Sequence, residues 1–118
     1  MKHYLQRLKK MKIKKKIRAA EIGLGVGAHQ ARTIYAHPNC ELVSICDLDK
    51  NRLSEIGSEF SNINKTQDEK DILLDPNIDL VCIASYDDYH YQQVITALDN
   101  GKHIYVEKPI CLKKNELK

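Results

Sequence analysis

The stretch Gly23-Leu24-Gly25-Val26-Gly27-Ala28 decides the fold of this chain, because it is a glycine-rich turn that directly follows an apolar run. It fits the dinucleotide-binding pattern G-x-G-x-x-G/A, with Ala28 in the third position. In that pattern the first glycine allows a tight turn, the second lets a pyrophosphate approach the backbone, and the third position keeps the helix close to its strand. A turn of this kind can also be purely structural, so taken alone it leaves both interpretations open.

Apolar runs alternate with helical patterns around this turn. We expect strands at residues 17–22, 41–47, 62–65, 79–84 and 102–107, and helices at residues 29–36, 49–60, 68–74 and 88–100. This alternation is typical of βαβ units, and the right-handed crossover rule then favours one topology. The sequence therefore predicts an α/β fold with a doubly wound parallel sheet.

Asp47 ends the second expected strand, 24 residues after Gly23. In dinucleotide-binding folds a carboxylate near this spacing reaches the adenosine ribose. A carboxylate there repels a 2′-phosphate, so Asp47 favours NAD over NADP, whereas the nearby Lys50 and Arg52 would favour NADP. The alternative role for Asp47 is to cap the helix that begins near Asp49.

The charge of the chain is unevenly distributed. Residues 1–18 hold nine Lys or Arg and no acid, whereas the rest of the chain holds 10 basic and 16 acidic residues. We interpret residues 1–16 as a basic, solvated N-terminal extension and residues 17–118 as one dinucleotide-binding domain. Contact with nucleic acid or an anionic membrane is the weaker alternative, since only Tyr4, Leu8 and Met11 suggest a helical stripe. We expect neither partner.

The four cysteines form no Cys-x-x-Cys pair and do not cluster with histidines in the sequence. We therefore expect no metal site and no disulfide framework. The sequence contains no run that is long and apolar enough to span a bilayer, and we expect a cytoplasmic protein.

From Ile17 to Pro109 the chain resembles the N-terminal Rossmann domain of the glucose-fructose oxidoreductase, inositol 2-dehydrogenase and rhizopine-catabolism (Gfo/Idh/MocA) family. The resemblance is carried by residues 22–25, Cys46-Asp47, residues 79–84 with His90 six residues beyond, and residues 101–109. The most specific part is the last, in which a glycine, a strand and Glu107-Lys108-Pro109 follow four βα units.

The resemblance implies hydride transfer between a nicotinamide cofactor and a carbinol carbon of a sugar, cyclitol or related polyol. Lys108 would stabilise the developing alkoxide, and Glu107 would orient that lysine or the cofactor. A solvated strand-end lysine with a surface partner is the alternative for this pair. His90 would border the cofactor, or would instead be a helix-start or surface histidine. The residues expected to bind NAD, or NADP, are Gly23, Gly25, Val26, Ala28, Asp47, Ala84, His90 and Glu107.

Members of this family continue into a last Rossmann strand and a C-terminal α/β domain that supplies the substrate pocket and the oligomer interface. We therefore expect this chain to be truncated before that strand and inactive alone, and the intact protein to be a homo-oligomer. Two other functions stay open at this point. One is a non-catalytic NAD(P)-sensing regulator, and the less favoured one is an S-adenosylmethionine-dependent methyltransferase, which has no need of Glu107-Lys108-Pro109.

Overall fold

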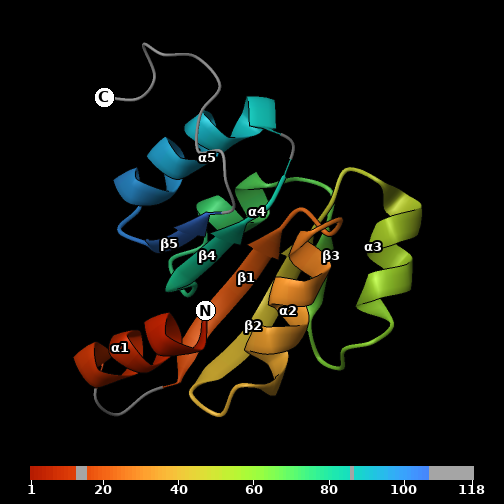
Figure 1. Ribbon diagram of the computed structural model, residues 1–118. Helices are drawn as coiled ribbons and strands as arrows, with labels where there is room; N and C mark the ends of the chain where they lie inside the picture. The colour runs from red at the N-terminus through yellow and green to blue at the C-terminus, as the bar shows by residue number, and fades with distance from the viewer. Residues whose placement is uncertain (13–15, 86, 107–118) are drawn as a thin grey trace.

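The central sheet has the doubly wound arrangement that the sequence predicts (Figure 1). The structure, a computed structural model, describes residues 1–12, 16–85 and 87–106, and of residues 8–12 and 87–90 it describes the backbone alone. Its strands are β1 (Ile17–Ile22), β2 (Cys40–Cys46), β3 (Asn64–Thr66), β4 (Leu80–Ile83) and β5 (His103–Val106). They pair in parallel in the order β3-β2-β1-β4-β5. The chain thus winds outward from β1 to β3 and then outward from β4 to β5, which makes the boundary between β1 and β4 the switch point.

Helices cover both faces of this sheet. The described helices that follow β1 are α2 (Gly27–Ala36), α3 (Lys50–Gly57), α4 (Lys70–Leu73) and α5 (Asp87–Asp99). Side chains of α2 and α3 belong to one buried cluster, and side chains of α4 and α5 belong to the other. All four residues of β4 are buried, which explains why this strand is a continuous apolar run.

The predicted elements are present, with ends within three residues of the expected positions. Asp49 caps α3, because its Oδ1 accepts hydrogen bonds from the backbone N–H groups of Asn51 and Arg52. Lys102 was expected to open the last strand, but it lies just before β5 and is buried. Its Nζ donates to the carbonyl oxygens of Asp75 and Ile78, and burial lowers its pKa. This lysine therefore holds the loop that precedes β4.

The N-terminal segment departs from expectation. Residues Lys2–Lys12 form a helix, α1, and Leu5 of this helix is completely buried in the same core cluster as α2. The Tyr4 hydroxyl donates to the carbonyl of Ile104 at 2.9 Å, and the Tyr4 ring lies 5.5 Å from that of Tyr105. The interpretation as a solvated extension is thus wrong for α1, because its apolar residues find partners on β5, about a hundred residues later in the chain.

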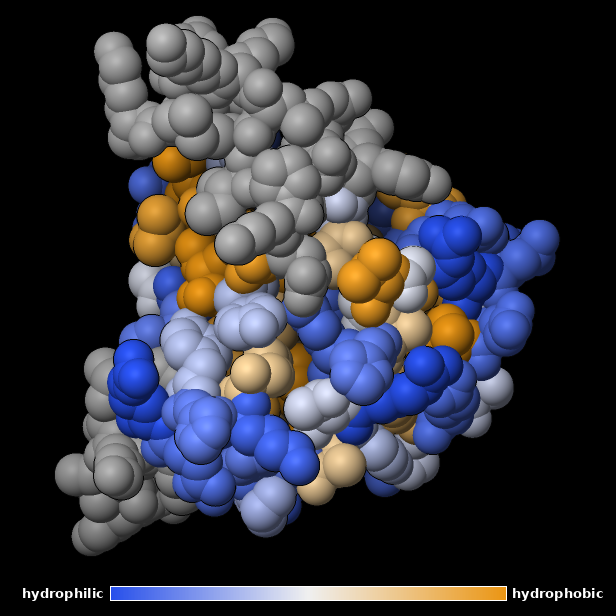
Figure 2. Space-filling model, viewed as in Figure 1, coloured by the Kyte–Doolittle hydropathy of each residue, from blue (hydrophilic) through white to orange (hydrophobic). Residues whose placement is uncertain are grey.

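The surface differs between α1 and α5, the two helices that lie beside β5 on opposite faces of the sheet. Figure 2 shows hydrophilic side chains over α1 and hydrophobic side chains over the region of α5. Tyr91, Ile95 and Leu98 are exposed at helical spacing on α5, so one outer stripe of that helix is apolar. No helix in the described part of the chain is long and apolar enough to cross a membrane.

We expect the substitution Leu5→Ala to lower the free energy of unfolding by about 2–5 kcal/mol, because it leaves a cavity at a fully buried position. Urea denaturation of the purified chain measures this change. The matched control is Lys2→Ala, on an exposed position of the same helix, which we expect to be nearly neutral. Equal stability of Leu5→Ala and the unaltered chain would restore the solvated-extension interpretation.

Candidate functional site

A cavity of about 370 Å³ opens where β1, β2 and β4 end, at the carboxyl edge of the sheet. Parallel sheets of this type bind ligands at that edge, beside the switch point. Five of the predicted cofactor-binding residues line the cavity together: Gly23, Gly25, Val26, Asp47 and Ala84. Residues that the sequence analysis did not single out for this site also line it: Leu48, Gln67, Glu69, Ser85 and Gln93. Ala28 instead packs in the core and borders a neighbouring hollow.

Gly23 is required by the way the turn meets the end of β4. Its φ of +93° lies in the left-handed region, which favours glycine. A Cβ on this residue would lie 2.6 Å from the Ala84 carbonyl and from the backbone nitrogen of Ser85. The first glycine of the motif therefore allows the turn after β1 to pack in direct contact with the backbone that follows β4.

Gly25 has a different reason to be glycine. A Cβ there would have ample room, since the nearest atom is Nη1 of Arg52 at 3.9 Å. The chain itself does not need a glycine at this exposed position, which lines the cavity. A close approach of ligand to the backbone would need one, as the dinucleotide-binding motif predicts.

Gly27 is explained by Glu21, a residue that the sequence analysis passed over as part of an apolar strand. Glu21 lies on β1, is completely buried, and places its Oε2 2.6 Å from where a Cβ on Gly27 would be. The available signal was a single charged residue inside the run Ala19-Ala20-Glu21-Ile22. A carboxyl group beneath the start of α2 thus takes the space that a side chain at position 27 would fill.

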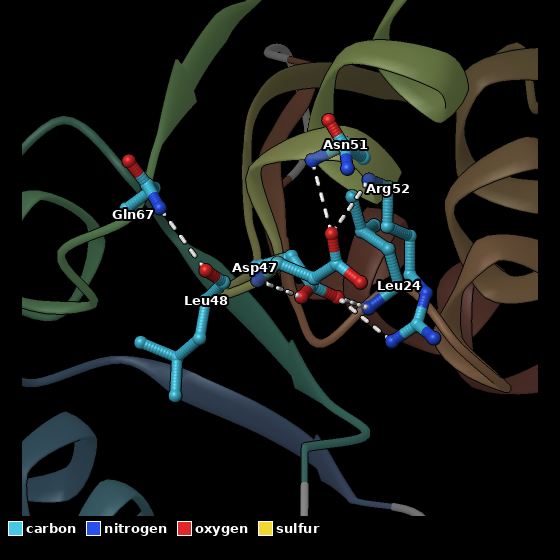
Figure 3. A network of polar contacts seen from close by, with 7 residues as sticks. Leu24, Asp47, Leu48, Asn51, Arg52 and Gln67 are labelled. Carbon is cyan, nitrogen blue, oxygen red and sulfur yellow. Dashed lines mark hydrogen bonds and ion pairs between the residues drawn. The ribbon is translucent and has the colours of Figure 1, made fainter.

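Asp47 joins the turn after β1 to the loop after β2 (Figure 3). Its Oδ2 accepts from the backbone N–H of Leu24 at 2.8 Å, and its Oδ1 accepts from that of Asp49 at 2.7 Å. Nη1 of Arg52 lies 3.8 Å from the same Oδ2. A carboxylate offers about four lone-pair positions, so two hydrogen bonds leave capacity for further donors. The alternative of helix capping belongs to Asp49, which bonds the first turn of α3.

The neighbouring side chains close this part of the cavity. Gln67 Nε2 donates to the carbonyl of Leu48 at 3.0 Å, which ties the segment after β3 to the loop after β2. Burial, together with the nearby carboxylates of Glu69 and Asp47, raises the pKa of the Cys46 thiol to about 12. Cys46 is therefore a neutral thiol and a small apolar wall at neutral pH. Within the described ranges, no group of three or more His, Cys, Asp or Glu could hold a metal ion.

The remaining predicted residues fall outside what the structure describes. Glu107 and Lys108 lie in the undescribed segment 107–118, although the strand before them, β5, ends at Val106 beside Ile83 of β4. His90 lies in the first turn of α5, and its side chain is outside the description. The roles assigned to these three residues stay predictions.

Substitution by alanine should change the free energy of unfolding far more at Gly23 than at Gly25. We expect Gly23→Ala to lower the free energy of unfolding by about 2–5 kcal/mol, because the backbone strain and the clash with Ala84 add together. Gly25→Ala, two residues away and with room for a methyl group, should change it by about 0.5 kcal/mol or less. Thermal or urea unfolding compares the two variants, and equal losses would contradict the geometry of the turn.

The family assignment follows from comparison with known proteins. The model of the oxidoreductase family with an NAD-binding Rossmann fold matches residues 17–118. The chain belongs to this family. The match confirms the resemblance to the Gfo/Idh/MocA dehydrogenases, and α1 lies outside it.

Several of the relatives are dehydrogenases. The scyllo-inositol 2-dehydrogenase (NAD(+)) of Bacillus subtilis is 35% identical over 104 residues, which is 86% of this chain and 30% of that protein. The D-glucoside 3-dehydrogenase of Escherichia coli is 30% identical over 95 residues, 79% of this chain and 27% of that protein. The chain thus spans about 30% of the length of the curated relatives it matches.

Two solved structures that are similar to this chain were crystallised with nicotinamide cofactors. Scyllo-inositol dehydrogenase of Lactobacillus casei, crystallised with NAD(H) and scyllo-inositol, superposes with a TM-score of 0.79 at 30% identity, over 86% of this chain and 31% of that one. Biliverdin reductase of Synechocystis, crystallised with biliverdin and NADP+, gives a TM-score of 0.79 at 27% identity, over 85% of this chain and 32% of that one. The chain is therefore an NAD-binding Rossmann domain, and both cofactors occur among its structural neighbours.

Proposed function

We propose that this chain is the cofactor-binding part of an oxidoreductase that transfers a hydride to or from a hydroxyl-bearing carbon of a sugar, cyclitol or related polyol. The observation that carries the cofactor assignment is the pairing of an open backbone at Gly25 with the carboxylate of Asp47 on one cavity. The inositol and glucoside dehydrogenases among its relatives support the polyol class. The methyltransferase and sensor alternatives find no support in these relatives.

The residues around the cavity fit a dinucleotide. The start of α2 supplies backbone N–H groups and the positive end of a helix dipole, which favour a pyrophosphate without any cationic side chain. Gly25 leaves room for that approach, and Asp47 has capacity to accept hydrogen bonds from the ribose hydroxyl groups. Bound NAD would supply the carbon that accepts or releases the hydride.

Asp47 supports a preference for NAD. A 2′-phosphate on the adenosine ribose would bring negative charge toward a carboxylate that is only 8% exposed. Arg52, on α3, is the one cation among the described residues that line the cavity, and its Nη1 lies 3.8 Å from Oδ2 of Asp47. Its positive charge is therefore partly neutralised by the same carboxylate that would repel the phosphate.

We expect the 118-residue chain to bind NADH more tightly than NADPH, and Asp47→Ala to narrow that difference. Fluorescence titration of each variant with both cofactors gives the ratio of the two dissociation constants. The ratio is informative because any distortion of the turn after β1 affects both cofactors alike. The control Asp49→Ala removes the cap of α3 and should leave the ratio unchanged. Equal affinities in the unaltered chain would contradict the role of Asp47.

For the intact protein, we propose that Lys108 acts on the reacting hydroxyl. A lysine ammonium beside a developing alkoxide stabilises it by charge and hydrogen bonding. Glu107 would hold that lysine or the cofactor in place. The position of Lys108 directly after the strand that pairs with β4 supports this assignment, since β5 ends at the edge where the cavity lies. Oligomeric assembly through the family's second domain is likewise a prediction from the resemblance.

In the intact protein, Lys108→Ala should lower kcat by about 100-fold or more while changing the affinity for NADH much less. Steady-state kinetics with an inositol or glucoside substrate, together with an NADH titration, separates the two effects. Lys102→Ala is a poor control, because that lysine is buried and structural. Lys65→Ala, at an exposed position on β3, is the better one. Near-normal turnover of Lys108→Ala would leave this lysine as a surface residue.

A further inference from the structure

The outer edge of β5, on the side away from β4, carries backbone groups that could bind another strand. Among the described strands β5 is the last of the sheet, and it pairs with β4. The N–H of His103 donates to the carbonyl of Asp79, which directly precedes β4. Successive residues of a parallel strand turn their N–H and C=O groups to opposite sides, so those of Ile104 and Val106 face away from β4. Two residues of β5 therefore offer donors and acceptors along the outer edge.

The two edges of the described sheet differ in how they resist the addition of a strand. Natural edge strands are protected by short length, by lysine or by proline. The β3 edge consists of three polar residues, Asn64–Thr66, and carries the exposed Lys65. The four residues of β5, His103–Val106, include no lysine, acid or proline, and the last three are β-branched or aromatic. Protection of the β5 edge must therefore come from outside the strand.

The helix α1 supplies a hydrogen bond to this edge. The carbonyl that accepts from the Tyr4 hydroxyl at 2.9 Å is that of Ile104, one of the groups that face away from β4. The Tyr4 ring lies against Tyr105, and the completely buried Leu5 anchors α1 in the core. Burial raises the pKa of Tyr4, so the phenol keeps its proton and donates at neutral pH. Within the described ranges, Tyr4 is the one side chain that hydrogen-bonds to β5.

The outer edge of β5 is complementary to itself. Two identical edge strands that are related by a twofold axis pair antiparallel, and the same residues meet on both sides. With the axis at Tyr105, Ile104 of each copy lies opposite Val106 of the other, and each such pair exchanges two hydrogen bonds. All the outward groups of these two residues are then bonded. This pairing needs the Ile104 carbonyl of both copies, which is the acceptor that Tyr4 occupies.

The helices beside β5 act on this pairing in opposite directions. When a sheet continues across such an axis, the same helix of each copy lies on the same face, next to its equivalent. The two α5 helices would bring together their exposed apolar side chains, Tyr91, Ile95 and Leu98, which favours association. The two α1 helices would bring together exposed cations, Lys2 and Arg7, which repel. Association thus gains from α5 and is opposed by α1.

We propose that the outer edge of β5 is a docking surface for β5 of a second copy of this chain, and that the Tyr4 hydroxyl blocks it by holding the Ile104 carbonyl. The helix α1 is then a cover that controls self-association of the domain. This inference goes beyond the proposed function, because it involves neither the cofactor nor a substrate. Its failure would leave the proposed function unchanged.

The test compares Tyr4→Phe with the unaltered 118-residue chain by light scattering over a series of protein concentrations. The substitution removes the hydroxyl but keeps the ring beside Tyr105 and leaves Leu5 in the core, so α1 stays packed. Loss of one neutral hydrogen bond changes an equilibrium about threefold to tenfold, and a symmetric dimer no longer has to break two of them. We therefore expect the association constant of the dimer to rise about tenfold to a hundredfold.

A second variant shows whether the association uses the β5 edge. Val106→Pro removes an N–H that faces away from β4 and leaves the ladder to β4 intact. Added to Tyr4→Phe, it should return the association constant to that of the unaltered chain. The matched control is Tyr35→Phe, which removes the same group from an exposed tyrosine that is bonded to Ser61, and it should leave association unchanged.

Three results would overturn the proposal. Equal association constants for Tyr4→Phe and the unaltered chain would show that Tyr4 does not block the edge. A rise that persists when Val106→Pro is added would place the dimer on another surface, such as the apolar stripe of α5. An equal rise in Tyr35→Phe would show that association does not depend on the contact between α1 and β5.

Discussion

The close packing of the turn after β1 against the end of β4 is the contact on which the site depends. At Gly23 there is no space for a Cβ between the turn and the Ala84–Ser85 backbone. This contact lies at the switch point, where the chain leaves β1 in one direction and β4 in the other. This contact fixes the position of the turn after β1. It therefore also places the Leu24 N–H within hydrogen-bonding distance of Asp47 and brings Ser85 and the turn before α2 to the same cavity.

The site depends on backbone geometry more than on side-chain charge. Among the described residues that line the cavity, Arg52 is the one cation, whereas Asp47 and Glu69 are acids. An anionic ligand therefore gains little from the net charge of these side chains, and its attraction must come from N–H groups at the start of α2. The glycines at positions 23 and 27 each make room for a different neighbour, whereas the backbone at Gly25 is left open.

The N-terminal helix shows how a domain can gain a covering element from outside its family's shared core. The family match begins at residue 17, yet α1 adds a fully buried leucine and a tyrosine pair to the core face beside β4 and β5. The exposed positions of Lys2 and Arg7 are compatible with this packing, because a helix can bury one side and keep charged side chains hydrated on the other. A basic composition is therefore poor evidence that a short segment is unstructured.

The sequence by itself determined the order of the elements, the doubly wound topology, the glycine turn and the position of Asp47. These features are local: apolar periodicity, turn residues and the spacing from Gly23 to Asp47 depend on neighbours within one βαβ unit. Only the tertiary structure decided the role of Glu21 beneath Gly27, the docking of Tyr4 and Leu5, and the hydrogen bonds from Ser85 through Gln93 to Glu69. Those contacts join residues from different βαβ units. The apolar periodicity within one unit does not predict which side chains of separate units will be in contact in the folded core.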